Sequence, residues 1–193
     1  MNRVCVFCGS HTGASPTYVA ASQALGRAVA KRGLGLVYGG ANIGLMGAVA
    51  DAALAEGGEV IGVIPESIAS KGIAHSKLTQ LHTLPTMHER KALMAELSDG
   101  FIALPGGYGT LEEFFEVLTW LQLGFHRKPC GLLNVDGFYD SLLKFTEHAV
   151  AQKFIRPQHH ASLLVDTDPG KLLDAMAAFQ PPNVQKWLAP PPQ

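Results

Sequence analysis

The chain of 193 residues is 47% hydrophobic and 16% charged, a composition that suits one well-buried domain and excludes a disordered protein. Fifteen Lys and Arg residues against sixteen Asp and Glu residues give a formal net charge of -1, so nucleic acid is not expected as the main partner. No apolar run approaches the ~20 residues that span a bilayer, and a strand pattern starts at residue 3 in place of a signal peptide. We therefore expect a cytoplasmic protein with no membrane partner.

Short apolar runs alternate with stretches of helical spacing along the chain. Strands are predicted at residues 3–8, 34–38, 59–64, 81–84, 101–104, 130–135 and 163–166. Helices are predicted at 16–32, 48–54, 86–97, 110–121, 137–153 and 169–179, with an irregular lid or short helix at 66–77. This alternation predicts an α/β fold: a single Rossmann-like doubly wound domain over residues 1–180 with about seven parallel strands flanked by helices. A Pro-rich tail at 181–193 follows the domain.

The sequence LPGGYGTLEE at residues 104–113 joins a predicted strand to a predicted helix. Its glycines let a ligand approach main-chain N–H groups, and the first turn of a helix presents unpaired N–H groups that suit a phosphate. We therefore predict an anion site here. With Thr110 as N-cap, Glu113 would complete a capping box. Alternatively, because a carboxylate would repel a phosphate, Glu113 serves chemistry near a sugar.

A second glycine-rich turn at residues 39–47 also follows a predicted strand, but it lacks the lysine of a P-loop. One such turn is as typical of tight helix–strand packing as of ligand binding. Two in one sheet favour a shared nucleotide pocket at the carboxyl ends of the strands.

Cys5 and Cys8, in the first predicted strand, have no second cysteine pair, and we expect both on one face of the sheet in a structural role.

Arg90 falls within the apolar face of the helix predicted at 86–97. A buried, unpaired guanidinium is costly, so we expect it to meet a carboxylate or a phosphate; the alternative to a ligand site is a structural ion pair. Lys91 lies at the edge of the same face and would reach a ligand or only solvent. Thr86 and Glu89 have the spacing of a capping box, which explains Glu89 without chemistry.

The stretch PGGYGTLEE at 105–113 resembles the PGGxGTxxE signature of the LONELY GUY phosphoribohydrolases, a family often labelled "lysine decarboxylase-like". Three further stretches agree with that family in order and spacing: FCGS at 7–10, YGG at 38–40 with GLMG at 44–47, and MHERK at 87–91. Together, the resemblance covers about residues 3–180. The combination of four stretches identifies the family specifically, whereas a single glycine motif would be weak evidence. The resemblance implies hydrolysis of the N-glycosidic bond of a nucleoside 5′-monophosphate, a cytokinin riboside 5′-monophosphate or AMP, to free base and ribose 5-phosphate. It also implies a homodimer with shared active sites.

The resemblance further implies that Arg90 and Glu113 are catalytic. A carboxylate near C1′ stabilises the positive charge that develops there and orients or deprotonates water, and we assign this role to Glu113. Arg90 holds its proton too strongly to donate it, so its role is electrostatic and positional. The substrate-binding residues that the resemblance implies are Ser10, Gly40, Met87, Lys91, Gly106, Gly107, Tyr108, Gly109, Thr110 and Thr119.

One position departs from the family pattern. Many members carry a Glu in the lid, before an Ile-Ala-His step, where this chain has Gly72, so the contact to the base or to a partner subunit differs. No lysine is singled out for a pyridoxal Schiff base, and the histidines lack ligand spacing, so we expect neither a decarboxylase, nor a cofactor, nor a metal. The competing hypothesis is a carrier of the same fold that binds a nucleotide or a nucleotide-like cofactor without turnover.

Overall fold

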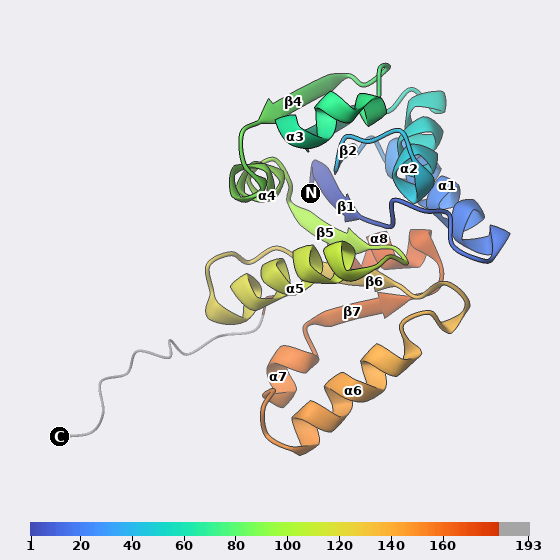
Figure 1. Ribbon diagram of the computed structural model, residues 1–193. Coiled ribbons are helices and arrows are strands. Elements are labelled where there is room, and N and C mark those ends of the chain that lie inside the picture. The colour runs from blue at the N-terminus through green and yellow to red at the C-terminus, as the bar shows by residue number, and fades with distance from the viewer. Residues whose placement is uncertain (182–193) are drawn as a thin grey trace.

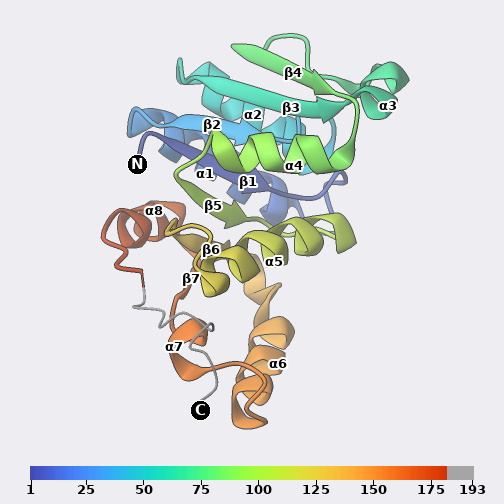
Figure 2. The same ribbon diagram turned by 90° about the vertical axis from the view of Figure 1, so that its left-hand side faces the viewer.

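The sheet of the protein is entirely parallel, as a computed structural model that describes residues 1–181 shows. Its seven strands lie in the order β4-β3-β2-β1-β5-β6-β7 (Figures 1 and 2). The strands are β1 Arg3–Phe7, β2 Gly35–Tyr38, β3 Val60–Pro65, β4 Gln80–Leu84, β5 Gly100–Ala103, β6 Cys130–Leu133 and β7 Leu163–Asp166. The predicted Rossmann-like α/β fold with about seven parallel strands is confirmed, and all seven predicted strands are present, with ends that differ by at most two residues.

Helices cover both faces of this sheet, as the two views show (Figures 1 and 2). The helices are α1 Pro16–Lys31, α2 Gly44–Ala55, α3 Glu66–Ile68, α4 Met87–Glu96, α5 Tyr108–Leu123, α6 Asp140–Ala151, α7 Pro157–His160 and α8 Pro169–Ala177. Buried side chains of α1, α2 and α8 pack on one face, and those of α4 and α5 pack on the other. The short helix α7 was not predicted, because four residues are too few to show a helical period.

The order of the strands reverses at β1, which pairs with β2 on one side and with β5 on the other. The chain winds outward from β1 to β4 and then crosses back through α4 to β5, on the opposite side of β1. In doubly wound sheets, ligands bind at the carboxyl ends of the strands where the order reverses. Phe7 and Ala103 pair at this point, so the loops that follow β1 and β5 meet there.

The central strand β1 contributes side chains to the cores on both faces of the sheet. Val4, Val6 and Cys8 belong to the core under α1, α2 and α8, while Cys5 and Phe7 belong to the core under α4 and α5. The expectation that Cys5 and Cys8 share a face is therefore wrong, since residues three apart in an extended chain point to opposite faces. Both thiols are free and buried.

The segment at 66–77 is folded and attached to the rest of the domain. It contains α3 and a π-helical turn, η1 Ala69–Ile73, in which Gly72 is left-handed with φ 74°. The backbone N–H of His75 donates to Gly40 O at 2.9 Å, and the imidazole of His75 contacts Asp51 at 3.0 Å. This segment is thus held against the second glycine-rich turn.

The last observations on the fold concern the C-terminal tail and membrane-spanning helices. The predicted Pro-rich tail lies, from residue 182 onward, outside the described residues. Within residues 1–181, no helix has the length and apolar character needed to cross a membrane.

Candidate active site

The loop at 104–107 carries the chain from β5 into α5 at the reversal point of the sheet. Helix α5 begins at Tyr108, with Gly107 as an extended N-cap that makes no side-chain capping bond. Leu111 is the first residue of α5 whose backbone N–H makes a helical hydrogen bond; it donates to Gly107 O at 3.1 Å. The N–H groups of the first turn of the helix point out of its end, beside the positive end of its dipole, a geometry that suits an anion.

The predicted capping box at Thr110 and Glu113 is wrong. The helix starts at Tyr108, so Thr110 lies inside its first turn and is not the N-cap. The Thr110 side chain folds back over Gly106, where a Cβ would come within 2.1 Å of Thr110 Oγ1. Because Gly107 supplies the extended backbone of the cap, the carboxylate of Glu113 is available for another partner.

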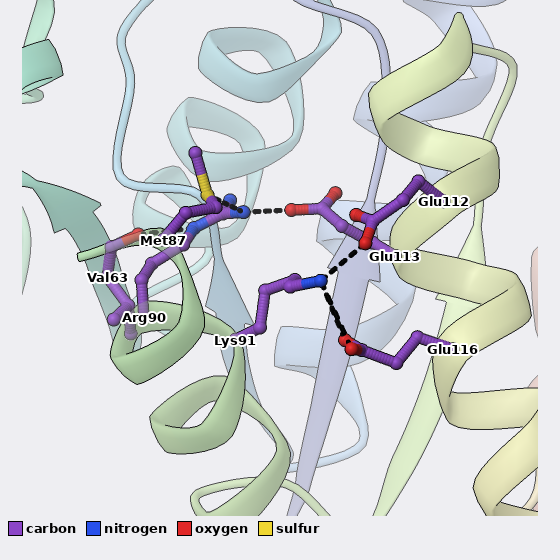
Figure 3. Close-up of polar contacts among 7 residues, drawn as sticks. All are labelled: Val63, Met87, Arg90, Lys91, Glu112, Glu113 and Glu116. Atoms are coloured by element: carbon purple, nitrogen blue, oxygen red, sulfur yellow. Dashed lines mark hydrogen bonds and ion pairs between the residues drawn. The ribbon is translucent and has the colours of Figure 1, made fainter.

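That partner is Arg90, from α4. The Arg90 and Glu113 side chains form an ion pair and are only 10% and 12% exposed (Figure 3). Arg90 Nε also donates to Val63 O at 3.2 Å. Gly39 leaves room for the guanidinium, since a Cβ there would lie 2.7 Å from Arg90 Nη2. The prediction that Arg90 meets a carboxylate or a phosphate is confirmed by Glu113, and a structural ion pair has the same contact.

Burial raises the pKa of the Glu113 carboxyl above its usual value, and the Arg90 guanidinium opposes that shift only in part. In this pair, burial makes the ionised form of the Glu113 carboxyl less favourable, whereas the Arg90 guanidinium stays charged. Perturbed carboxyl groups of this kind occur at sites of acid–base chemistry, as well as in structural ion pairs.

A cavity of about 540 Å³ lies between the loops that follow β1 and β5, and Arg90 and Glu113 line it. Nine of the twelve predicted site residues line this cavity: Ser10, Met87, Arg90, Gly106, Gly107, Tyr108, Gly109, Thr110 and Glu113. The loop after β1 is tied to the loop after β5 because Gly9 N donates to Pro105 O at 3.0 Å. Among the described residues that line the cavity, Arg90 and Glu113 are the only ones with a Lys, Arg, Asp or Glu side chain.

Three predicted substrate-binding residues do not line this cavity. Gly40, left-handed with φ 75°, packs on Ile64 and accepts the N–H of His75. Thr119 lines a separate cavity of about 160 Å³ together with residues of α6 and α7. Whether these residues bind substrate stays a prediction.

Lys91, the third of these residues, points from α4 toward α5. Its ammonium group forms ion pairs with Glu112 and, at 3.1 Å, with Glu116 (Figure 3). Lys91 thus fastens α4 to α5 beside the Arg90–Glu113 pair and does not line the cavity.

The cavity also contains residues that the sequence reasoning did not assign to the site. Tyr18 of α1 and Phe138 form part of its wall and meet edge to face, with centroids 5.8 Å apart. Phe138 follows β6, a neighbour of β5 in the sheet, so the rule that ligands lie at carboxyl strand ends would have indicated it. Within residues 1–181, no group of three or more His, Cys, Asp or Glu side chains is arranged to hold a metal ion.

The fold and the cavity together define a Rossmann-like protein whose glycine loop and helix N-terminus, at the reversal point of the sheet, adjoin a buried guanidinium–carboxylate pair. The model of the family described as "Possible lysine decarboxylase" matches residues 46–176. The chain is 53% identical over 180 residues to the cytokinin riboside 5′-monophosphate phosphoribohydrolase of Rhodococcoides fascians, covering 93% of this chain and 89% of that protein. It is 46% identical over 179 residues to a protein of the same activity name from Arabidopsis thaliana, covering 93% and 82% of the two chains. The chain belongs to this family, the LONELY GUY phosphoribohydrolases.

Two solved structures with the same fold are more distant in sequence than these relatives. The molybdenum cofactor binding protein of Rippkaea orientalis superposes with a TM-score of 0.70 at 22% identity, covering 92% of this chain and 96% of that chain. The Moco carrier protein of Chlamydomonas reinhardtii has a TM-score of 0.70 at 20% identity, with the same coverage. At these identities the likeness establishes the fold alone.

Proposed function

We propose that this protein hydrolyses the N-glycosidic bond of a nucleoside 5′-monophosphate and releases the free base and ribose 5-phosphate. The observation that carries the proposal is the buried Arg90–Glu113 pair, which lines the same cavity as the N-terminus of α5. The relatives named cytokinin riboside 5′-monophosphate phosphoribohydrolase cover 93% of the chain and support it. The substrate is a cytokinin riboside 5′-monophosphate or AMP.

The phosphate would bind at the glycine loop. The cavity offers it no lysine and no unpaired arginine among the described residues, so the backbone N–H groups of residues 108–110 and the hydroxyls of Ser10 and Thr110 would hold it. The phosphate thereby fixes the position of the ribose relative to Glu113, on the next turn of α5.

Glu113 would act on the ribose. Breaking the N-glycosidic bond develops positive charge at C1′ and on the ring oxygen, which a carboxylate stabilises, while the same group orients or deprotonates the attacking water. Arg90 holds the Glu113 carboxylate in place and favours its ionised form against the effect of burial.

The test is chromatographic detection of the free base after incubation with AMP and with isopentenyl-AMP. The wild type should release base, and Glu113→Gln, which keeps the shape of the side chain without its charge, should lose at least a hundredfold in kcat while still binding the nucleotide. Glu112→Gln is the matched control, because Glu112 is 57% exposed and pairs with Lys91 outside the cavity. It should retain base release.

The carrier hypothesis makes the opposite prediction. A carrier would bind the nucleotide with the same affinity in the wild type and in Glu113→Gln, and neither protein would release base. That result would overturn the hydrolase proposal. The ratio of the wild-type rates of base release from AMP and from isopentenyl-AMP identifies the preferred base.

We also propose that the protein forms a homodimer with shared active sites. The proposal is motivated by the family resemblance and by Thr119, which lies outside the cavity of its own protomer. Light scattering should give twice the mass of one chain; a monomeric mass with full activity would contradict the proposal. The cytoplasmic location stays a prediction.

A further inference from the structure

The carbonyl of Leu104, the last residue before the Pro-Gly-Gly loop, has a side-chain partner instead of a strand partner. Pairing between β5 and β6 ends at Ala103 and Leu132, so β6 does not continue alongside Leu104. Tyr139 takes the place of the missing strand: its hydroxyl donates to Leu104 O at 2.6 Å. Tyr139 is 1% exposed, and burial raises the pKa of its hydroxyl, which therefore stays protonated and able to donate.

A tight turn after β6 brings Tyr139 to this position. Asn134 Oδ1 accepts the backbone N–H of Tyr139 at 2.8 Å, and Asn134 Nδ2 donates to Asp140 at 2.8 Å. Between them, Asp136 and Gly137 are left-handed, with φ 50° and 70°. A left-handed non-glycine residue costs free energy, so the surrounding contacts must hold Asp136 in this conformation.

Helix α1 holds the outer side of the turn. Thr17 Oγ1 donates to Asp136 Oδ2 at 2.6 Å, and the next residue, Tyr18, packs edge to face on Phe138. Phe138 in turn meets the ring of Tyr139 at 5.0 Å. The turn is therefore attached at one side to α1 and at the other to the residue before the glycine loop.

We propose that Tyr139 is a positioning residue for the phosphate-binding loop, and that the turn at 134–139 fixes the conformation of this loop. Leu104 O is fixed by Tyr139, and Pro105 O is fixed by Gly9 N, so both carbonyls that precede Gly106 are held. Two fixed carbonyls leave the glycines little freedom to move, and the N–H groups of the first helical turn stay directed at the phosphate. The inference rests on the proposed function, because it assigns the loop a phosphate ligand.

The test measures the dissociation constant of ribose 5-phosphate by calorimetry and the steady-state kinetics with AMP. Tyr139→Phe keeps the buried ring and removes only the hydroxyl. It should raise the dissociation constant of ribose 5-phosphate about fivefold, the effect of losing one hydrogen bond to the loop, and raise the KM for AMP in parallel with little change in kcat.

Two further variants separate positioning from a general loss of stability. Ser98→Ala removes a comparable buried hydroxyl, which donates to Met94 O at 2.8 Å and does not line the cavity. It should lower the melting temperature as much as Tyr139→Phe does and leave ribose 5-phosphate binding unchanged. Thr17→Val removes the hydroxyl of an exposed side chain that bonds Asp136 and also contacts Ser15, the N-cap of α1. It should weaken binding in the same direction as Tyr139→Phe, by a smaller factor.

The outcomes distinguish the two proposals. If the wild type binds neither ribose 5-phosphate nor AMP, the proposed function fails and this inference fails with it. The inference is overturned, and the proposed function stands, if the wild type and Tyr139→Phe bind ribose 5-phosphate equally well. The same holds if Ser98→Ala weakens binding as much as Tyr139→Phe does, because Tyr139 would then serve stability alone.

Discussion

Glu113 experiences two opposing influences, burial and a neighbouring guanidinium, and burial is the stronger. Its pKa therefore lies above the ordinary glutamate value of about 4.3. If the proposed reaction needs the ionised carboxylate, turnover is lost as the pH falls through this raised pKa. The acid limb of kcat should then lie above pH ~4.3.

The measurement is kcat for AMP as a function of pH, because kcat reports the enzyme–substrate complex. Arg90→Gln removes the cation that opposes the effect of burial, so its acid limb should move to a still higher pH. A limb at or below the ordinary glutamate value in the wild type would contradict the assignment of Glu113.

At the scale of elements, the glycine loop before α5 contains two adjacent glycines with different roles. A Cβ on Gly106 would lie 2.1 Å from Thr110 Oγ1 and 3.0 Å from Gly9 N, whereas a Cβ on Gly107 would meet nothing within 4 Å. Gly106 is thus required by packing inside the protein. Gly107 leaves open the side from which a ligand approaches.

Alanine substitution should separate these two roles. Gly106→Ala should lower the free energy of unfolding by about 1–3 kcal/mol, a typical cost of overpacking, and weaken nucleotide binding as well. Gly107→Ala should leave the stability within about 0.5 kcal/mol of the wild type and weaken nucleotide binding only. Urea unfolding and calorimetry with AMP measure the two quantities. Equal losses of stability in both variants would contradict this division.

The two ends of the sheet serve different purposes. The carboxyl ends of the strands carry the cavity, while the amino ends carry a link between Arg3 of β1 and Glu59, just before β3, at 2.8 Å. The hydrogen bond from Arg3 lowers the pKa of Glu59. The pKa of Glu59 is thus lower in the folded protein than in the unfolded chain, where it is about 4.3. The link therefore stabilises the fold above pH ~4.3, and its contribution is lost as the pH falls through the pKa of Glu59 in the folded protein.

Acid unfolding followed by circular dichroism tests this link. Arg3→Met should be less stable than the wild type at pH 7, and the difference should shrink below pH ~4 as Glu59 is protonated in both proteins. Lys31→Met is the control, since Lys31 is 64% exposed and its contact with Glu56 spans 3.6 Å. A difference between Arg3→Met and the wild type that does not change with pH would show that the ion pair is not its source.

The proposed dimer predicts that two defective subunits can restore one another. Glu113→Gln lacks the residue assigned to catalysis, and Thr119→Val alters a residue that lies outside the cavity of its own protomer. If each cavity is completed by Thr119 of the partner subunit, one site of the mixed dimer contains both intact residues. The co-expressed, doubly tagged heterodimer should therefore release base faster than the mean of the two homodimers. A rate equal to that mean would contradict shared sites.

Features that depend on residues close together along the chain could be predicted before the fold was known. Alternating apolar runs and helical spacings located all seven strands, and Thr86 and Glu89 form the capping box that their spacing indicated. Arg90, within an apolar helical face, was expected to meet a carboxylate or a phosphate, and it meets the carboxylate of Glu113. These features follow from backbone period, local hydrogen bonding and the cost of burying a charge.

Contacts between segments far apart along the chain could not be predicted in this way. Gly107, and not Thr110, caps α5, because the cap depends on the backbone conformation of the loop. Phe138 reaches the cavity, and Tyr139 reaches Leu104, because β6 lies beside β5. Contacts of this kind depend on strand order and on the paths of the crossovers, which residue spacing along the chain does not encode.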